Sequence, residues 1–334
     1  MSARWRIHTI GLIALCLIAI IASAAAARPG APLRSEVVPA NGVGIHCLDS
    51  GGTKPALLFI PGLGDTAYMM EDFATRFVRT NRVVIMTRRG FGRSSVPRDG
   101  YDLSSRVEDI RGLLDALKIQ RVILIGHSIA GDELTAFAIK YPERVASLIY
   151  LDAAYDRGDP EAPQPTSAVW GKVLDAWVGN GEAARKSLER YRASQRRTFF
   201  GIWTGAQERN LRETVVVNVD GTVSSRTPPW VARAISEADK EAKPPLSSVK
   251  VPALLIFARQ RLERRGLALD EATRSGLMRD EESYEAYFSR YLSGLRKQAN
   301  FQIVVMGQTM HHLYLERPLE VERAMRRFLA THRA

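Results

Sequence analysis

The sequence predicts an α/β protein with a doubly wound, mostly parallel sheet and a helical insertion. Short runs of Val, Ile and Leu alternate with amphipathic segments from residue 43 to residue 151, and the alternation resumes at residue 251. Continuous apolar runs are typical of strands that helices bury on both faces, and this alternation is typical of parallel sheets. We therefore expect residues 28–155 and 247–334 to form one core, which a lid-like insertion at 156–246 interrupts.

Each expected element follows from the same patterns. Apolar runs predict strands at 43–48, 56–60, 83–87, 122–125, 148–151, 251–258 and 301–306. Apolar residues at helical spacing predict helices at 69–79, 104–117, 129–140 and 319–329, with a second helical stretch at 262–298. Within the insertion, Asp220-Gly221 between two short apolar segments predicts a hairpin.

Residues 1–27 have the pattern of a secretory signal peptide. Two arginines precede a strongly apolar run at 10–21, and Ala25-Ala26-Ala27 then supplies a cleavage site. We expect cleavage and export, either to the periplasm or to the medium. The alternative is that residues 8–27 stay attached as a membrane anchor, in which case the membrane would be a partner.

The composition narrows the possible classes of protein. A hydrophobic content of 46% is ordinary for a globular chain. The net charge of +11 is scattered, without the basic, aromatic-interleaved motifs that nucleic-acid binding uses. Cys16 would leave with the signal peptide, and Cys47 lies in an apolar run, so we expect Cys47 to be a core residue. No Cys/His cluster predicts a metal, and the oligomeric state stays open.

The most informative segment joins a predicted strand to a predicted helix. The strand at 122–125 runs into Gly126-His127-Ser128, and Ala130-Gly131 follows at the start of the helix. A nucleophile on such a sharp turn needs small neighbours, because the turn brings the flanking residues together. Gly126 and Ala130 meet this need, and Gly131 lets the helix approach the sheet. The N-terminus of the helix also favours developing negative charge, so Ser128 is the expected nucleophile.

A second motif follows the strand at 56–60. Pro61-Gly62-Leu63-Gly64-Asp65 forms a glycine-rich loop ahead of a helix. Backbone N–H groups in such a loop can face an oxyanion. We expect the two donors to be the N–H groups of Leu63 and Ile129.

With these two motifs the sequence resembles the α/β-hydrolase superfamily, over residues 37–155 and 247–331. The segment from Thr87 to Ser95 is similar to the superfamily's Asp-x-Arg-Gly-x-Gly-x-Ser, with Thr87 in place of the Asp. The resemblance implies that the catalytic base follows the last strand. The superfamily's spacing of this histidine ahead of Glu316-Arg317-Pro318 selects His311, with His312 as the alternative.

An arginine occupies the position where the superfamily often carries its acid. That position follows the strand predicted at 251–258, and here it holds Arg261. Branches such as the haloalkane dehalogenases carry the acid at the end of the strand after the elbow, and Asp152 has the matching position. Glu263 is the rival, with Asp156 and Asp270 as further alternatives. Some carboxylate is required, because an unsupported histidine would lose its tautomer and orientation.

These residues predict a serine hydrolase that cleaves an ester or related acyl bond through an acyl-enzyme. The expected partner is a small, mainly apolar acyl substrate, with no nucleic acid, and neither a cofactor nor a metal is implied. Aromatic residues in the insertion fit either an apolar pocket or the insertion's own core: Trp170, Trp177, Trp203 and Trp230. The alternative function is a non-catalytic binding protein of the same fold with a degenerate triad.

Overall fold

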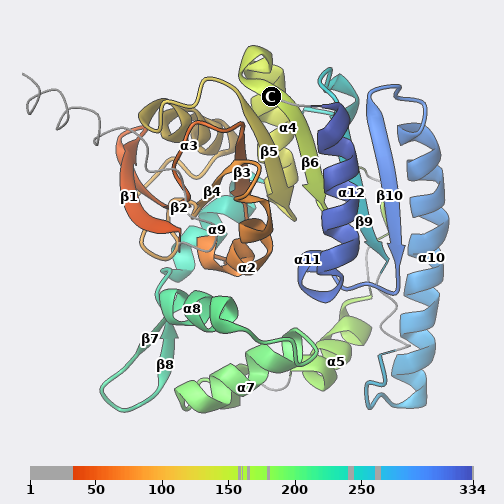
Figure 1. Cartoon of the computed structure of the whole chain (residues 1–334). Helices are drawn as coiled ribbons and strands as arrows, with labels where there is room; N and C mark the ends of the chain where they lie inside the picture. The colour runs from red at the N-terminus through yellow and green to blue at the C-terminus, as the bar shows by residue number, and fades with distance from the viewer. Residues whose placement is uncertain are drawn as a thin grey trace, which may run out of the picture.

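The computed structural model describes residues 33–156, 159, 161–163, 166–178, 181–239, 244–259 and 265–332. The predicted signal peptide lies outside these residues. Within them, no helix is both long and apolar enough to cross a membrane. The expected fold class is confirmed, since helices cover both faces of a mostly parallel sheet and a helical insertion interrupts it (Figure 1).

The sheet built by the described residues has eight strands in the order β1-β2-β4-β3-β5-β6-β9-β10. Their bounds are β1 Arg34–Ala40, β2 Val43–Asp49, β3 Ala56–Ile60, β4 Arg82–Met86, β5 Val122–His127, β6 Val145–Leu151, β9 Ala253–Arg259 and β10 Phe301–Gly307. The β1–β2 and β2–β4 pairs are antiparallel and the other neighbouring pairs are parallel. The carboxyl ends of the parallel strands therefore meet at one edge, where ligand sites of such sheets form.

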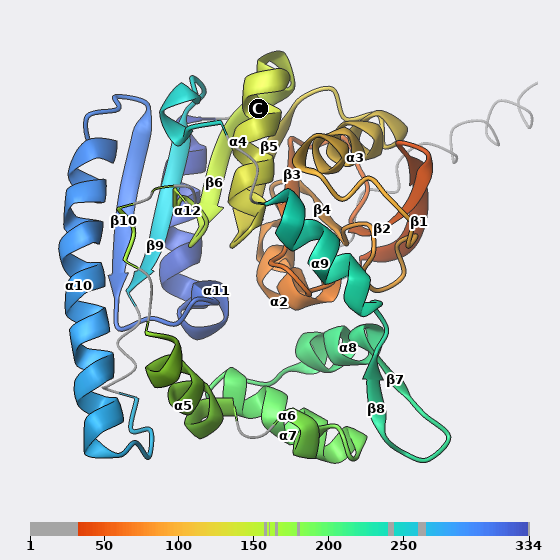
Figure 2. The same cartoon turned by 180° about the vertical axis from the view of Figure 1, so that it is seen from behind.

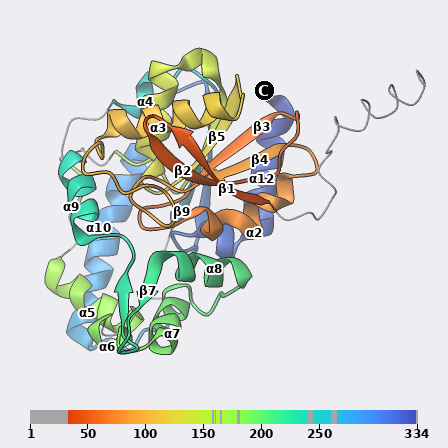
Figure 3. The ribbon, with the colours of Figure 1, turned by 90° about the vertical axis from the view of Figure 1, so that its left-hand side faces the viewer.

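Helices enclose the sheet on both faces (Figures 2 and 3). One layer contains α3 (Leu103–Ala116), α4 (Ala130–Lys140) and α10 (Glu271–Leu295). The other contains α12 (Pro318–Thr331) and the short helices η1 (Ala67–Met70), α2 (Glu71–Ala74) and η2 (Thr75–Phe77). Successive residues of a strand point to opposite faces, so Leu57 and Leu58 of β3 belong to two separate buried clusters.

The insertion lies beside the carboxyl ends of the parallel strands (Figures 1 and 2). It contains α5 Ser167–Val178, α6 Gly181–Ala184, α7 Leu188–Thr198, α8 Gly205–Thr214, the β7 Val215–Val217 and β8 Val223–Ser225 hairpin, and α9 Pro229–Ala238. Hydrogen bonds of 2.8 Å from the backbone N–H and the hydroxyl of Thr66 to Asn210 Oδ1 join α8 to the core. The antiparallel pairing of β7 with β8 confirms the hairpin predicted at Asp220-Gly221.

Tryptophan side chains of the insertion contact residues both inside and outside it. Trp177 stacks on Phe200 with ring centroids 5.1 Å apart. Trp230 packs edge-on against Tyr101 at 5.6 Å, and Trp203 Nε1 donates to Glu208 at 3.3 Å. The Trp177 and Trp203 contacts lie within the insertion and fit a core of its own, whereas Trp230 packs on Tyr101 of the main core.

Two elements differ from the prediction. The expected helix at 69–79 is broken, because 3-10 turns flank a single α-helical turn, α2. The apolar residues of this segment nevertheless lie in the core, since Met69, Phe73 and Phe77 are all buried. The edge strand β1 was not predicted, because its exposed and polar residues give no apolar run. Cys47 is fully buried, as expected for a core residue, and burial raises the pKa of its thiol to about 12.

Candidate active site

Ser128 lies on the turn between β5 and α4, at the sheet edge where the parallel strands end. Its φ of 58° is in the left-handed region, which costs energy for any residue with a Cβ and marks a strained turn. A side chain at Gly126 would lie 2.9 Å from the Ala130 Cβ, and one at Gly131 only 1.8 Å from the carbonyl oxygen of Ala153. Small residues are therefore required on both sides of Ser128, for the steric reason inferred from the sequence.

His311 and Asp152 meet at the same edge. The Nδ1 atom of His311 lies 2.6 Å from Asp152 Oδ2. His311 follows β10 and its side chain is 40% exposed, whereas Asp152 directly follows β6 and its side chain is only 7% exposed. With Nδ1 bound to the carboxylate, Nε2 is the ring nitrogen that stays available to a nucleophile or a substrate.

The main chain of β9 holds Asp152 in place. Asp152 N donates to the carbonyl of Ile256 at 2.7 Å, and Ala258 N donates to Asp152 Oδ1 at 2.8 Å. The hydroxyl of Tyr155 donates to the same oxygen. Burial and the neighbouring Asp152 charge raise the pKa of Tyr155 well above its usual value, so this hydroxyl keeps its proton. The carboxylate is thereby oriented from two sides, with Oδ2 left for His311.

The other acids and the second histidine lie elsewhere. Asp270 caps α10, where its side chain accepts from Thr273 N at 2.7 Å, and Asp156 is exposed. Glu263 lies outside the described residues. His312 faces Asp65, with Nε2 3.5 Å from Oδ2, rather than Asp152. Of the carboxylates considered from the sequence, Asp152 is the one that the described structure places against His311.

The glycine-rich loop after β3 is fixed by Arg88, whose role the sequence did not reveal. The guanidinium donates to the carbonyl oxygens of Pro61 and Gly62, the latter at 3.0 Å. It also forms a bidentate pair with Glu133 of α4, at 2.6 and 2.8 Å, and both side chains are almost fully buried. Because these carbonyls are bound to Arg88, the peptide planes of the loop are set, which includes the direction of the Leu63 N–H.

The loop that carries His311 is held by a second ion pair. Met310 N donates to Glu316 Oε2 at 2.6 Å, and Arg265 pairs with the same carboxylate at 2.6 Å. Arg265 also donates to the carbonyl of Gln308, which has a φ of 51°. The Glu316 position used to select His311 thus has a physical role, since it anchors the histidine loop.

His127, between Gly126 and Ser128, lies beneath both histidines of that loop. Its ring centroid is 4.4 Å from that of His311 and 4.6 Å from that of His312. His127 Nε2 lies 3.1 Å from the carbonyl oxygen of His311. Burial, together with the neighbouring His311, His312 and Arg88, lowers the pKa of His127 well below its usual value, so the ring is neutral.

The family model described as the alpha/beta hydrolase fold matches residues 55–260, more than half of the chain. The chain therefore belongs to the alpha/beta hydrolase fold family, and the resemblance stated from its motifs is confirmed.

Hydrolases are among the proteins to which the chain is similar. It is 33% identical over 132 residues to a 2-hydroxy-6-oxononadienedioate/2-hydroxy-6-oxononatrienedioate hydrolase of Paraburkholderia phymatum, covering 37% of this chain and 45% of the relative. It is 31% identical over 179 residues to a 2-hydroxy-6-oxo-2,4-heptadienoate hydrolase of Pseudomonas putida, covering 49% and 64%. Each match spans less than two thirds of the relative's length.

The solved structure of E-2-(acetamidomethylene)succinate hydrolase has the same fold. It superposes with a TM-score of 0.63 at 19% identity and covers 89% of this chain and 99% of that one. At this identity the likeness concerns the fold alone. Together with the family match, it identifies the chain as an α/β-hydrolase.

Proposed function

We propose that this protein is a serine hydrolase that cleaves an ester or related acyl bond of a small, mainly apolar substrate. The observation that carries the proposal is the 2.6 Å contact of His311 with Asp152, at the sheet edge where Ser128 occupies a strained turn. A base oriented by a buried carboxylate is what a serine hydroxyl needs in order to become nucleophilic. This pair favours catalysis over the alternative of a binding protein with a degenerate triad.

In the proposed mechanism the Ser128 hydroxyl attacks the substrate carbonyl while His311 Nε2 takes its proton. The N–H groups of Leu63 and Ile129 stabilise the oxyanion, and His311 then protonates the leaving group. Water attacks the acyl-enzyme with His311 again acting as the base, which restores Ser128. Asp152 stabilises the imidazolium that forms in each half of the reaction.

The chemistry of the relatives supports acyl transfer without fixing the substrate. The two relatives are named as hydrolases of 2-hydroxy-6-oxo acids, and the solved structures of similar fold include an enol-lactonase and a thermophilic esterase. Lactones and esters have an acyl carbonyl, which is where a Ser128 adduct would form.

A fluorophosphonate probe tests this proposal. The wild-type protein should be labelled and should hydrolyse short p-nitrophenyl esters, while Ser128→Ala should lose both activities. Ser104→Ala, on the exposed side of α3, is the matched control and should behave as the wild type does. Labelling that survives Ser128→Ala would exclude Ser128 as the nucleophile.

We also propose that the mature protein is exported after removal of residues 1–27. The supporting observation is the arginine-containing, then apolar, then alanine-rich order of these residues. N-terminal sequencing of the protein from fractionated cells tests the proposal. A start near Arg28 in the exported fraction supports it, and an intact N-terminus in the membrane fraction would instead support the anchor.

A further inference from the structure

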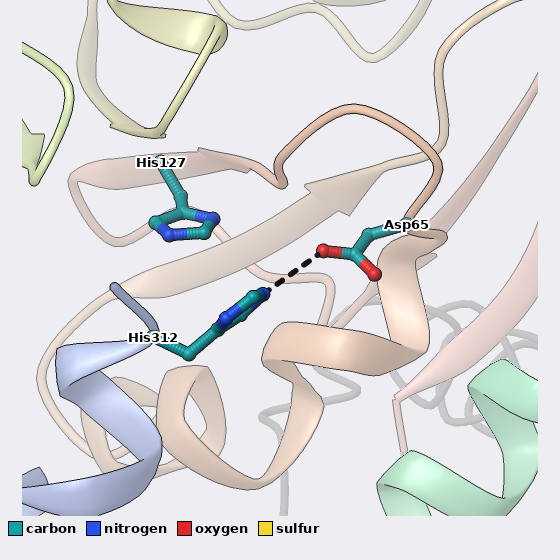
Figure 4. Close-up of side chains that lie close together, drawn as sticks. All are labelled: Asp65, His127 and His312. Carbon is teal, nitrogen blue, oxygen red and sulfur yellow. Dashed lines mark hydrogen bonds and ion pairs between the residues drawn. The ribbon is translucent and has the colours of Figure 1, made fainter. Parts of the chain in front are cut away.

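We propose that Asp65, His127 and His312 bind one divalent transition-metal ion of the Zn²⁺ type, at a site separate from the His311–Asp152 pair. The three residues come from the loop after β3, the end of β5 and the residue before α11 (Leu313–Glu316). One potential ligand atom of each lies within 4.8 Å of the other two. Figure 4 shows the three side chains pointing toward one another. The inference does not depend on Ser128 being a nucleophile.

The hydrogen bonding of His127 leaves one of its ring nitrogens as a potential metal ligand. Its Nε2 lies 3.1 Å from the His311 carbonyl, which can only accept, so this nitrogen carries the proton. Nδ1 is then left with a lone pair. It is buried, and it has no hydrogen-bond partner among the described residues, while the residue as a whole is 1% exposed. A metal-bound histidine characteristically donates its other ring N–H to a carbonyl or carboxylate, which is the arrangement found here.

Atoms of two of the three residues border the space beside Gly62. A Cβ at this position would lie 2.9 Å from His127 Nδ1 and 3.4 Å from Asp65 Oδ2. The bare lone pair of His127 and the carboxylate oxygen of Asp65 therefore border the same small volume, which stays open because residue 62 has no side chain. A cation in this volume would satisfy both atoms.

The distance between the side chains of Asp65 and His312 also fits a shared metal ion. Asp65 Oδ2 and His312 Nε2 are 3.5 Å apart, which is long for a hydrogen bond. Two ligands at about 2.0–2.1 Å from a tetrahedral zinc ion lie roughly 3.3 Å from each other. The observed separation is thus close to one edge of such a coordination shell. The side chains of Asp65 and His312 are 15% and 20% exposed, so an ion can reach them from solvent.

The ligand chemistry selects the class of ion. Two imidazole nitrogens and one carboxylate oxygen suit Zn²⁺, Co²⁺ or Ni²⁺, whereas Mg²⁺ and Ca²⁺ prefer oxygen ligands throughout. Three protein ligands leave a fourth position for water. A bound ion would tie together the loop with Leu63, the elbow with Ser128 and the loop with His311.

Metal titration of the full chain, after chelator treatment and dialysis, tests the proposal. We expect Co²⁺ to give the absorption of a tetrahedral complex at one ion per chain, and calorimetry to show one Zn²⁺ site. His312→Ala should weaken Zn²⁺ binding by more than about 100-fold, because losing even a group that only hydrogen-bonds to a metal ligand costs about 10–100-fold. Asp65→Asn, which keeps the side-chain shape, should weaken it in the same direction.

His311→Ala is the matched control, since it removes the adjacent imidazole and keeps the carbonyl that holds His127. It should bind Zn²⁺ as the wild type does, although it should lose ester hydrolysis. The proposal is overturned if the wild type shows no saturable binding, if His312→Ala binds as tightly as the wild type, or if His311→Ala loses as much affinity as His312→Ala. Circular dichroism confirms that each variant is folded. If the probe failed to label Ser128, the metal-binding results would not change. The metal site and the serine hydrolase mechanism are therefore tested independently.

Discussion

His311 Nδ1 and Asp152 Oδ2 are 2.6 Å apart, although 159 positions separate the two residues in the chain. The contact forms because β9 lies between β6 and β10 in the sheet, with all three strands parallel. Residues that follow β6 and β10 therefore emerge at the same edge. An acid at the end of β6 reaches the histidine loop across a single strand.

Asp152→Asn should reduce kcat for ester hydrolysis by about 10⁴-fold, because an amide favours the wrong tautomer of His311. Steady-state kinetics with a p-nitrophenyl ester measures this loss. Asp270→Asn is the control and should keep wild-type kcat, since Asp270 caps α10 and pairs with Lys172. Equal activity of Asp152→Asn and the wild type would remove Asp152 from the mechanism.

Arg88→Lys should lower kcat by about 100-fold with little change in KM, because a shift of about 1 Å in an oxyanion donor has this effect. Lysine keeps the positive charge beside Glu133. It cannot replace the planar guanidinium, whose N–H groups bind both the carboxylate and two loop carbonyls. Arg88 is thus a positioning residue.

The control for Arg88 is its neighbour. Arg89→Lys disturbs an equally buried pair, with Asp109 of α3, that does not touch the loop. A merely structural role for Arg88 would make both variants lose stability alike and leave kcat of the folded fraction intact in both. Stability is followed by urea denaturation.

Gly131→Ala should destabilise the protein by more than about 3 kcal/mol, since the new Cβ would lie 1.8 Å from the carbonyl oxygen of Ala153 and the backbone itself must shift. Gly171→Ala in α5 is the matched change, with no atom within 4 Å of the new Cβ. It should be neutral or stabilise the protein by up to about 1 kcal/mol, because alanine favours helix. Urea denaturation of both variants tests the contrast, and an equal stability of the two would contradict it.

The free energy of unfolding should fall as the pH drops from 7 to 5, and His46 should account for about 2 kcal/mol of this fall. Burial, aided by the charge of Arg93, lowers the pKa of His46 to about 4. The unfolded chain takes up the proton below about pH 6.5 while the folded chain does not. The contribution of His46 to the free energy of unfolding is therefore fully present above pH 6.5 and is lost as the pH falls toward 4.

His46→Gln removes the titrating group, so its unfolding free energy should depend less steeply on pH over this range. Urea denaturation at pH 7 and pH 5 gives the comparison. An identical slope for the variant and the wild type would show that His46 does not carry this effect.

Periodicity in the sequence was sufficient to predict the parallel core, because β3 and β5 are fully buried, and β3 and the first four residues of β5 are unbroken apolar runs. The same signal fails at β1, an antiparallel edge strand with an exposed face. A different signal was present there. Asn41 and Gly42, with φ of 49° and 74°, form the turn between β1 and β2 and are a typical hairpin pair.

The positions of single site residues were predictable where a local motif carries them, as at Ser128. Contacts between distant segments were not. The support of the loop after β3 by Arg88 and the convergence of Asp65, His127 and His312 depend on strand order and on loop conformation. No spacing along the chain encodes either of them.

The hydrogen bonds between Asp152 and the main chain of β9 also affect which mutations the protein can tolerate. Backbone groups of Ile256 and Ala258 bind Asp152 whatever their side chains are. In the proposed mechanism, residues 260–264 are thus released from supplying a catalytic group, and two of the five are basic. Mutation can alter the charge or length of this segment while Asp152 keeps its main-chain partners in β9.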